Sequence, residues 1–237
     1  TPNNEKTDKM WKFVKKKIKW NNTKRIYANE GVKKAYKEGV GNVAEINLTL
    51  VAMLREANLK ANPILISTRD HGVPLFPTQD GFNYVIAGVE TSNGVILLDA
   101  TEKYSTPNVL PLRALNWMGR IVRENGSSGE INLFPTNKTK ETVFIMANID
   151  SEGLLTGTER CSFDNLLALN TRSKYNNLSE DELIGILEKR NNNIEIGDVM
   201  VDAENLDMVD EFNIFIKPHK VSNLIILLHN IFILSTL

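Results

Sequence analysis

Cysteine is nearly absent from this sequence, since Cys161 is the only one among 237 residues. A single thiol excludes an intramolecular disulfide and any zinc or iron–sulfur site built from several cysteines. Histidine is almost as rare, and the positions of His71, His219 and His229 match no metal-binding spacing. We therefore expect no metal and no cofactor.

A surplus of charge of either sign is also missing, because 28 basic residues are balanced by 29 acidic ones and the net charge is -1. This balance argues against a generally cationic nucleic-acid-binding protein, which needs positive charge to neutralise phosphates. One lysine-rich stretch stands out in the first predicted helix. A solvated helix face is favoured there over a phosphate- or lipid-binding patch. Its members are Lys12, Lys15, Lys16, Lys17 and Lys19.

No apolar stretch reaches the roughly 20 residues that a membrane-spanning helix needs. Residues 221–237 contain two apolar runs broken by His229 and Asn230. A buried strand pair, or a segment foreign to the native domain, is favoured there over a membrane anchor. The chain begins at Thr1 with no signal-peptide pattern, so we expect a fragment or processed product of a longer protein.

Hydrophobic residues make up 42% of the chain, enough to bury a core. Residues 6–20 form a predicted amphipathic helix whose buried face carries Trp11, Val14 and Ile18. A second helix is predicted around residues 31–37. The apolar periodicity of residues 43–58 indicates a third, largely buried one.

Short β-branched runs follow the helices at residues 64–67, 82–89 and 95–98. Residues 92–94, Ser-Asn-Gly, predict a hairpin between the last two runs. The loop at residues 70–81 is expected to border a cleft. Helices followed by an antiparallel sheet indicate an α+β domain.

A Gly-Ser-Ser-Gly cluster at residues 126–129 indicates a boundary. We expect a core domain at residues 1–125, a mostly β region with one helix at residues 130–220, and the hydrophobic tail at residues 221–237. Strands are predicted at residues 141–146 and 154–161. Ser179 and Glu182 form a capping-box pattern for the helix.

Four sequence pieces carry a family resemblance: residues 41–45 (GNVAE), 61–69 (ANPILISTR), 82–86 (FNYVI) and 97–101 (LLDAT). Together they resemble the transglutaminase-like core of the papain-type superfamily, over residues 32–122. That family places a catalytic Cys at the start of a buried helix, a His on the next strand and an Asp on the strand after it. The resemblance implies helices packed on an antiparallel sheet.

The region after Phe134 resembles the β-rich extension of multidomain proteins of unknown function from Bacteroidetes-type bacteria. In those proteins a β domain precedes the core, and most are secreted or periplasmic. The resemblance therefore implies a periplasmic or cell-envelope location and contacts with further domains of the same protein.

The resemblance also implies a degenerate catalytic triad. Val43 occupies the nucleophile position and has nothing to ionise, and Tyr84 replaces the His. A phenol with a pKa near 10 is a poor proton acceptor at neutral pH. Only Asp99 keeps the residue of the family. We expect its carboxylate to accept a hydrogen bond from the Tyr84 hydroxyl, a pair kept for packing in preference to ligand binding.

Three other residues could in principle supply the missing catalytic groups, but a non-catalytic role is favoured for each. Cys161 is expected to be an incidental thiol and His71 an ordinary loop residue. Glu45 is expected to be a first-turn carboxylate that the helix N-terminus favours. Residues expected to border a binding cleft are Asn42, Glu45, His71, Asn83, Tyr84 and Asp99.

Three functions remain open. A non-catalytic module that binds extended peptide or a cell-envelope polymer, or acts as a scaffold, is the first. An active cysteine peptidase or transamidase that uses Cys161 is the second. A purely structural module of a larger protein is the third.

Overall fold

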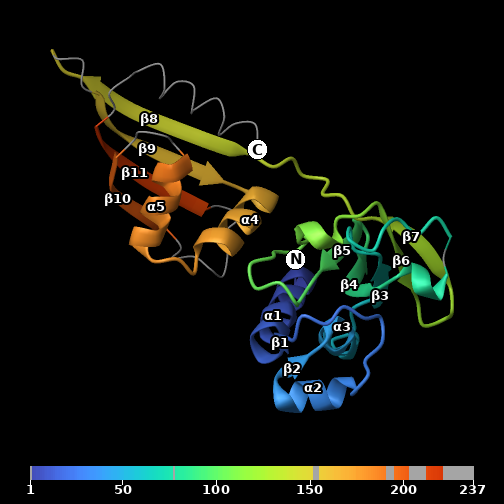
Figure 1. Cartoon of the computed structure of the whole chain (residues 1–237). Coiled ribbons are helices and arrows are strands. Elements are labelled where there is room, and N and C mark those ends of the chain that lie inside the picture. The colour runs from blue at the N-terminus through green and yellow to red at the C-terminus, as the bar shows by residue number, and fades with distance from the viewer. Residues whose placement is uncertain (1, 77, 152–154, 191–194, 203–211, 221–237) are drawn as a thin grey trace. The chain divides into compact units, whose positions relative to one another are not determined.

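The computed structural model describes residues 2–76, 78–151, 155–190, 195–202 and 212–220. The chain divides into two compact units, Thr1–Thr136 and Asn137–Leu237 (Figure 1). Each unit combines helices with an antiparallel sheet, so the predicted α+β class is confirmed. The predictions for residues 221–237 lie outside the described residues.

The first unit is built on a five-stranded sheet in the order β5-β4-β3-β6-β7, with every neighbouring pair antiparallel. Three helices precede this sheet in the chain. Their bounds are Pro2–Lys17 (α1), Val32–Glu38 (α2) and Val43–Glu56 (α3). The strands are Ala61–Ile66 (β3), Tyr84–Thr91 (β4), Gly94–Leu98 (β5), Met118–Val122 (β6) and Ser128–Asn132 (β7).

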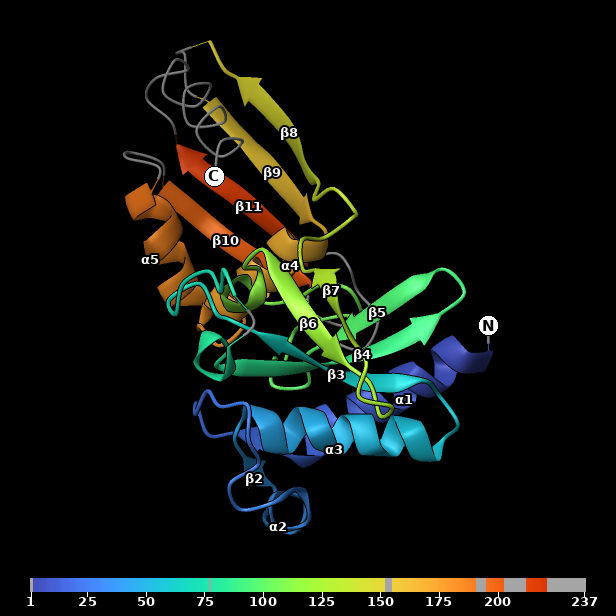
Figure 2. The same ribbon diagram turned by 90° about the vertical axis from the view of Figure 1, so that its right-hand side faces the viewer.

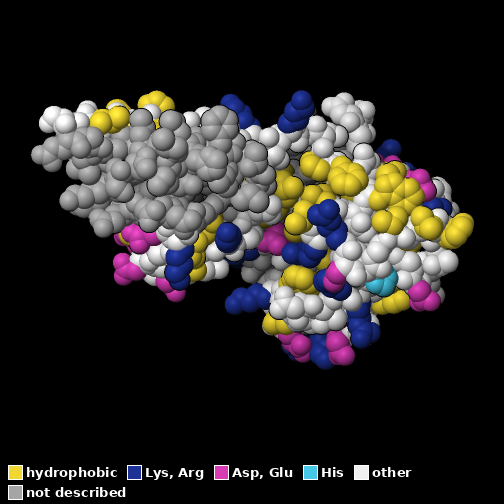
Figure 3. Space-filling model, turned by 45° about the horizontal axis from the view of Figure 1, so that its top comes forward, with side chains coloured by type: hydrophobic (Ala, Val, Ile, Leu, Met, Phe, Trp, Pro, Cys, Tyr) yellow, Lys and Arg dark blue, Asp and Glu magenta, His cyan; other side chains and the backbone are white. Residues whose placement is uncertain are grey.

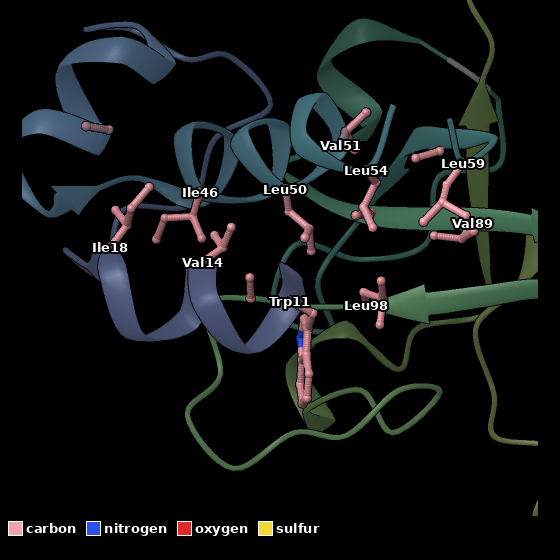
Figure 4. Close-up of a cluster of buried hydrophobic side chains, with 14 residues drawn as sticks. Trp11, Val14, Ile18, Ile46, Leu50, Val51, Leu54, Leu59, Val89 and Leu98 are labelled. Atoms are coloured by element: carbon pink, nitrogen blue, oxygen red, sulfur yellow. The ribbon is translucent and has the colours of Figure 1, made fainter. Parts of the chain in front are cut away.

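Helices α1 and α3 lie along one face of this sheet, as Figure 2 shows. The apolar face of α1 is buried as the sequence predicts, and Trp11 and Val14 of the helix and Ile18, directly after it, are exposed by no more than 2%. Their side chains pack with those of α3, such as Leu50, and with sheet residues such as Leu98 (Figure 4). This core fixes the start of α3 relative to strands β4 and β5.

The predicted first helix is too long at its C-terminal end. Helix α1 ends at Lys17, and Trp20 belongs instead to a short strand, Lys19–Trp20 (β1). This strand pairs in parallel with Val40–Gly41 (β2), directly before α3. The backbone carbonyl of Thr23 accepts the N–H of Val43 at 3.2 Å, so the segment after β1 runs past the N-terminus of α3.

Strands β4 and β5 form the predicted hairpin, in which Thr91 pairs with Gly94. Only Gly94 adopts a positive φ, +120°, and Asn93 does not. The turn therefore uses the conformational freedom of glycine alone.

The second unit has a four-stranded antiparallel sheet in the order β10-β11-β9-β8. The strands are Glu141–Ile149 (β8), Leu155–Phe163 (β9), Glu195–Asp202 (β10) and Phe212–Lys220 (β11). The capping box of Ser179 and Glu182 starts the predicted helix, Glu180–Arg190 (α5). A second helix, Asn165–Tyr175 (α4), was not predicted, and its Ala168 and Tyr175 pack with α5 residues such as Leu183.

The cluster at residues 126–129 does not separate the two units. Gly126, with a φ of +80°, and Ser127 lie in the turn of the β6–β7 hairpin, and Ser128 and Gly129 are the first residues of β7. The first unit therefore continues to Thr136, about ten residues beyond the predicted boundary. No helix in the described part of the chain is long and apolar enough to cross a bilayer.

Candidate functional site

Tyr84 and Asp99 meet at one end of the β4–β5 hairpin. Tyr84 is the first residue of β4, and Asp99 directly follows β5. The Tyr84 hydroxyl donates a 2.7 Å hydrogen bond to Oδ2 of Asp99, as the sequence predicts. Both residues are buried, with exposed fractions of 0% and 1%.

The other oxygen of Asp99 is bound by two neighbouring residues. Oδ1 accepts hydrogen bonds from the backbone N–H of Thr101 at 2.9 Å and from its hydroxyl at 2.7 Å. It also accepts one from Nδ2 of Asn47 at 3.2 Å. A buried carboxylate with this many donors satisfies the requirement that buried polar groups be paired.

Arg113 closes the network from outside. Its Nε donates to the Tyr84 hydroxyl and its Nη2 to the Thr101 hydroxyl, both at 3.1 Å. The two hydroxyl oxygens lie 2.7 Å apart. With both hydroxyl hydrogens directed to Asp99, the guanidinium supplies the donors that hold these oxygens together. It also places a positive charge 3.8 Å from Oδ2 of Asp99.

Three side chains, those of Arg113, Trp20 and Glu102, lie on the outer side of this network. The Arg113 guanidinium lies 4.6 Å from the ring centroid of Trp20, and Trp20 meets the Tyr84 ring edge-on at 6.4 Å. Nη1 of Arg113 donates to the Glu102 carboxylate at 3.0 Å. The Arg113 side chain is 22% exposed and that of Glu102 16%, so this end of the network reaches solvent.

The environment keeps the phenol protonated. Burial raises the pKa of Tyr84 well above its ordinary value, and the nearby charge of Asp99 acts in the same direction. Arg113 opposes both effects without overcoming them. Because the phenol is already protonated near neutral pH, it cannot act as the base that takes a proton from a nucleophile.

Val43 is the first residue of α3 and has 0% exposure. Asn47 lies one helical turn later on the same face. Its Nδ2 donates to the Val85 carbonyl at 2.9 Å as well as to Asp99, and its Oδ1 accepts the Ala100 N–H at 2.9 Å. Asn47 thus ties the face of α3 that carries Val43 to the Tyr84–Asp99 pair.

Two predicted cleft residues at the start of α3 bind their own chain. Asn42 and Glu45 form a capping box, in which each side chain accepts the backbone N–H of the other. Glu45 also accepts the Glu30 N–H at 2.8 Å. These side chains organise the N-terminus of α3, as capping residues do.

Asn83 and His71 form hydrogen bonds at the ends of the loop at residues 70–81 and within it. The Asn83 side chain binds the backbone N–H and the hydroxyl of Thr68, at 2.9 and 2.7 Å. His71 is exposed, and its Nε2 lies 2.9 Å from the carbonyl of Asp80. The imidazole of His71 therefore contacts a residue of its own loop, and its backbone N–H donates to the Thr68 carbonyl.

Cys161 lies in the second unit, on β9, and is 5% exposed. Its Sγ donates to the Glu159 carboxylate at 3.0 Å. In the described part of the chain, no three His, Cys, Asp or Glu residues are grouped so that they could hold a metal ion.

The residues that complete the network are not among the predicted site residues. Asn47 had a detectable signal, because it is a polar residue on an otherwise apolar face of a predicted helix. Thr101 lies within a motif piece but was not singled out. Arg113 lies in a short 3-10 helix, Leu112–Ala114 (η2), and Trp20 lies at the end of a predicted helix, and neither position carries a local signal.

Comparison with known proteins gave no match. No family model matches the chain, and neither a curated protein nor a solved structure is significantly similar to it. The transglutaminase-like resemblance therefore depends on the residues of this chain alone.

Proposed function

We propose that the first unit is a non-catalytic transglutaminase-like domain that binds an extended peptide, as a module of a larger periplasmic or cell-envelope protein. The observation that carries the proposal is the hydrogen bond from Tyr84 to Asp99. A hydroxyl takes the place that an imidazole has in the family's triad, and the carboxylate keeps a donor without a base being present.

The lack of catalysis is supported by the chemistry of all three positions. Val43 offers no nucleophile, and Tyr84 stays protonated. The Thr101 hydroxyl is the nearest alternative nucleophile, but it donates to Asp99 and accepts from Arg113. The carboxylate that accepts the Thr101 hydrogen also accepts hydrogen bonds from Tyr84 and Asn47, so it is already engaged in the network and is poorly placed to act as a base for this hydroxyl.

Peptide binding is supported by the partly exposed Arg113. Its Nε, Nη1 and Nη2 each donate one hydrogen bond to a described residue, and a guanidinium has five N–H donors. Two donors therefore remain for a carbonyl or carboxylate of a ligand. The Trp20 ring beside them provides an apolar contact surface.

The first experiment measures peptidase and transamidase turnover of the whole chain, before and after alkylation of Cys161. We expect no turnover in either state. Turnover that alkylation abolishes would make Cys161 the nucleophile and would overturn the proposal. Turnover that survives alkylation would also overturn it.

A second experiment tests the transglutaminase-like geometry itself. In a Cys161→Ser background, Val43→Cys with Tyr84→His restores a thiol and an imidazole beside Asp99. We expect the new thiol to become reactive toward iodoacetamide at a pH well below the pH at which an ordinary cysteine does. The reason is that a helix N-terminus and an imidazole stabilise the thiolate. Val51→Cys, at another buried position of α3, is the matched control. Equal pH profiles for the two thiols would contradict the assigned positions.

A purely structural role is the second candidate, and the complete burial of Val43 and Tyr84 favours it. A peptide array separates the two roles. Under our proposal, peptides bind the wild-type chain and the Arg120→Gln variant, and Arg113→Gln weakens binding. A folded wild-type chain that binds no peptide on the array would favour the structural role.

A further inference from the structure

The two edges of the five-stranded sheet differ in how their backbone groups are satisfied. At the β5 edge, Asn108 has a φ of +67° and folds back on the strand. Its N–H donates to the Leu97 carbonyl, and its Oδ1 accepts the Leu97 N–H, both at 2.9 Å. This arrangement blocks the middle of the β5 edge against pairing with another strand.

The β7 edge has no such cover in the described residues (Figure 1). Hydrogen bonds from Arg123 to Ser127 and from Leu133 to Trp117 fix the pairing of the β6–β7 hairpin. By the alternation of antiparallel pairs, Ser128, Glu130 and Asn132 then direct their backbone N–H and C=O groups away from β6. These groups form no backbone hydrogen bond with any other described residue.

β7 also lacks the usual protection of an edge strand. Its sequence, SGEIN, contains neither proline nor lysine, and its pairing with β6 has no bulge. Glu130 is its one charged residue, and it is exposed. No ion pair joins Glu130 to a described residue, because Arg120, opposite it, binds the Ser128 hydroxyl instead.

This charge disfavours a second copy of the chain as the occupant of the edge. Only one antiparallel two-fold register uses all three outward-facing residues of both copies, and it places Glu130 opposite Glu130 of the other copy. Like charges directly opposite each other destabilise a strand pair. A basic side chain at that position is complementary to Glu130.

Two exposed aromatic residues lie at the end of this edge. Trp117 is 44% exposed and Phe134 51%. The Trp117 carbonyl accepts the N–H of Leu133, which places both aromatic residues beside the last pair of the hairpin. Trp117 has a φ of +62°, which is uncommon for a bulky residue. Figure 3 shows hydrophobic side chains gathered on the surface of this unit.

We propose that the outer edge of β7 binds an extended peptide segment of a partner protein as a sixth strand. A Lys or Arg of the peptide lies opposite Glu130, and an apolar side chain contacts Trp117 and Phe134. Backbone hydrogen bonds to Ser128, Glu130 and Asn132 supply the pairing, and the side chains supply the specificity. Neither Arg113 nor Trp20 takes part in this edge pairing, and the inference does not depend on the function proposed above.

The test selects peptides from a random heptapeptide phage library on the full-length chain. Binding of a synthetic consensus peptide is then measured by calorimetry. We expect the selected peptides to share a basic and an apolar residue. We also expect the peptide to slow hydrogen exchange of the Ser128, Glu130 and Asn132 amides at least about tenfold, as new hydrogen bonds do.

Two variants make the test specific. Glu130→Pro removes an outward N–H that β6 does not use, and it is expected to weaken binding at least about tenfold. Glu130→Lys is expected to shift selection to acidic peptides. Glu56→Lys, a charge reversal at the end of α3, is the matched control, and circular dichroism verifies the fold of each variant.

Three results would overturn the proposal. One is that no peptide is selected, and another is that the peptide binds Glu130→Pro as tightly as the wild type. The third is a dimer in sedimentation experiments that Glu130→Pro dissociates, which would make a second copy the occupant.

Discussion

The Tyr84 hydroxyl donates a 2.7 Å hydrogen bond to Oδ2 of Asp99, inside a network in which both side chains are buried from solvent. Asn47 and Thr101 bind the opposite oxygen of the carboxylate, and Arg113 brings a compensating charge. Such a network stabilises the fold only while each donor has its acceptor, because an unpaired buried polar group is costly. Its members are therefore the most informative residues to change.

Tyr84→Phe tests the central hydrogen bond. The substitution leaves Oδ2 of Asp99 without its closest donor and Nε of Arg113 without its acceptor. We expect the free energy of unfolding to fall by about 1–3 kcal/mol, the cost of an unsatisfied buried group. Urea unfolding followed by tryptophan fluorescence measures it, since Trp11, Trp20 and Trp117 all lie in the first unit. Tyr36→Phe, at a 40% exposed position, should change nothing measurable.

Asn47→Ala tests the link between α3 and the hairpin. It removes one acceptor and two donor contacts and leaves the Ala100 N–H and the Val85 carbonyl unpaired in the interior. A loss of about 2–4 kcal/mol is expected from these groups together. The same urea titration measures it, with the exposed turn variant Asn93→Ala as the control. A loss equal to that of the control would mean that Asn47 does not stabilise the network.

Lys15 gives the first unit a pH dependence. Burial lowers the pKa of Lys15 from 10.5 to about 8, although Glu102 and Asp99 act in the opposite direction. Its Nζ donates to the Ser105 carbonyl at 3.0 Å and lies 3.6 Å from the centroid of the Trp11 ring.

The folded state therefore binds this proton less tightly than the unfolded state. The Lys15 contribution to stability rises as the pH increases from about 8 to 10.5. We expect wild type to gain stability relative to Lys15→Met over this interval, as measured by urea unfolding at several pH values. Lys16→Met, at an exposed position of the same helix, should run parallel to the wild type. A constant difference between wild type and Lys15→Met would contradict the prediction.

Gly119→Ala tests the packing of β6 against β3. A Cβ at this position would lie 2.7 Å from Cγ2 of Ile64 and 3.2 Å from the Leu65 carbonyl oxygen. We expect a loss of about 1–3 kcal/mol from overpacking, measured by thermal unfolding. Gly185→Ala in α5 is the matched comparison, because nothing lies within 4 Å of its added Cβ. It should stabilise the second unit by about 0.5–1 kcal/mol, since alanine favours the helix. Stabilisation by Gly119→Ala would contradict this account.

Much of the local structure was predictable from the sequence. Apolar residues at helical spacing identified the buried faces of α1 and α3, and the Asn-Gly turn identified the β4–β5 hairpin. The Tyr84–Asp99 hydrogen bond was predicted as well, but through a family resemblance that aligned two distant residues. The unit boundary and helix α4 were not found, because glycine and serine serve hairpin turns as readily as linkers.

The sequence by itself determined the α+β class, excluded an intramolecular disulfide, and fixed which side chains have groups that can serve as nucleophile or base. These properties follow from composition and from periodicities of a few residues. Only the tertiary structure decided that Arg113 and Trp20 join Tyr84, Asp99 and Thr101 in one network. It also decided that the β5 edge is closed while β7 stays open within the described residues. Both features depend on contacts between segments that are far apart in the chain, and local sequence patterns do not predict such contacts.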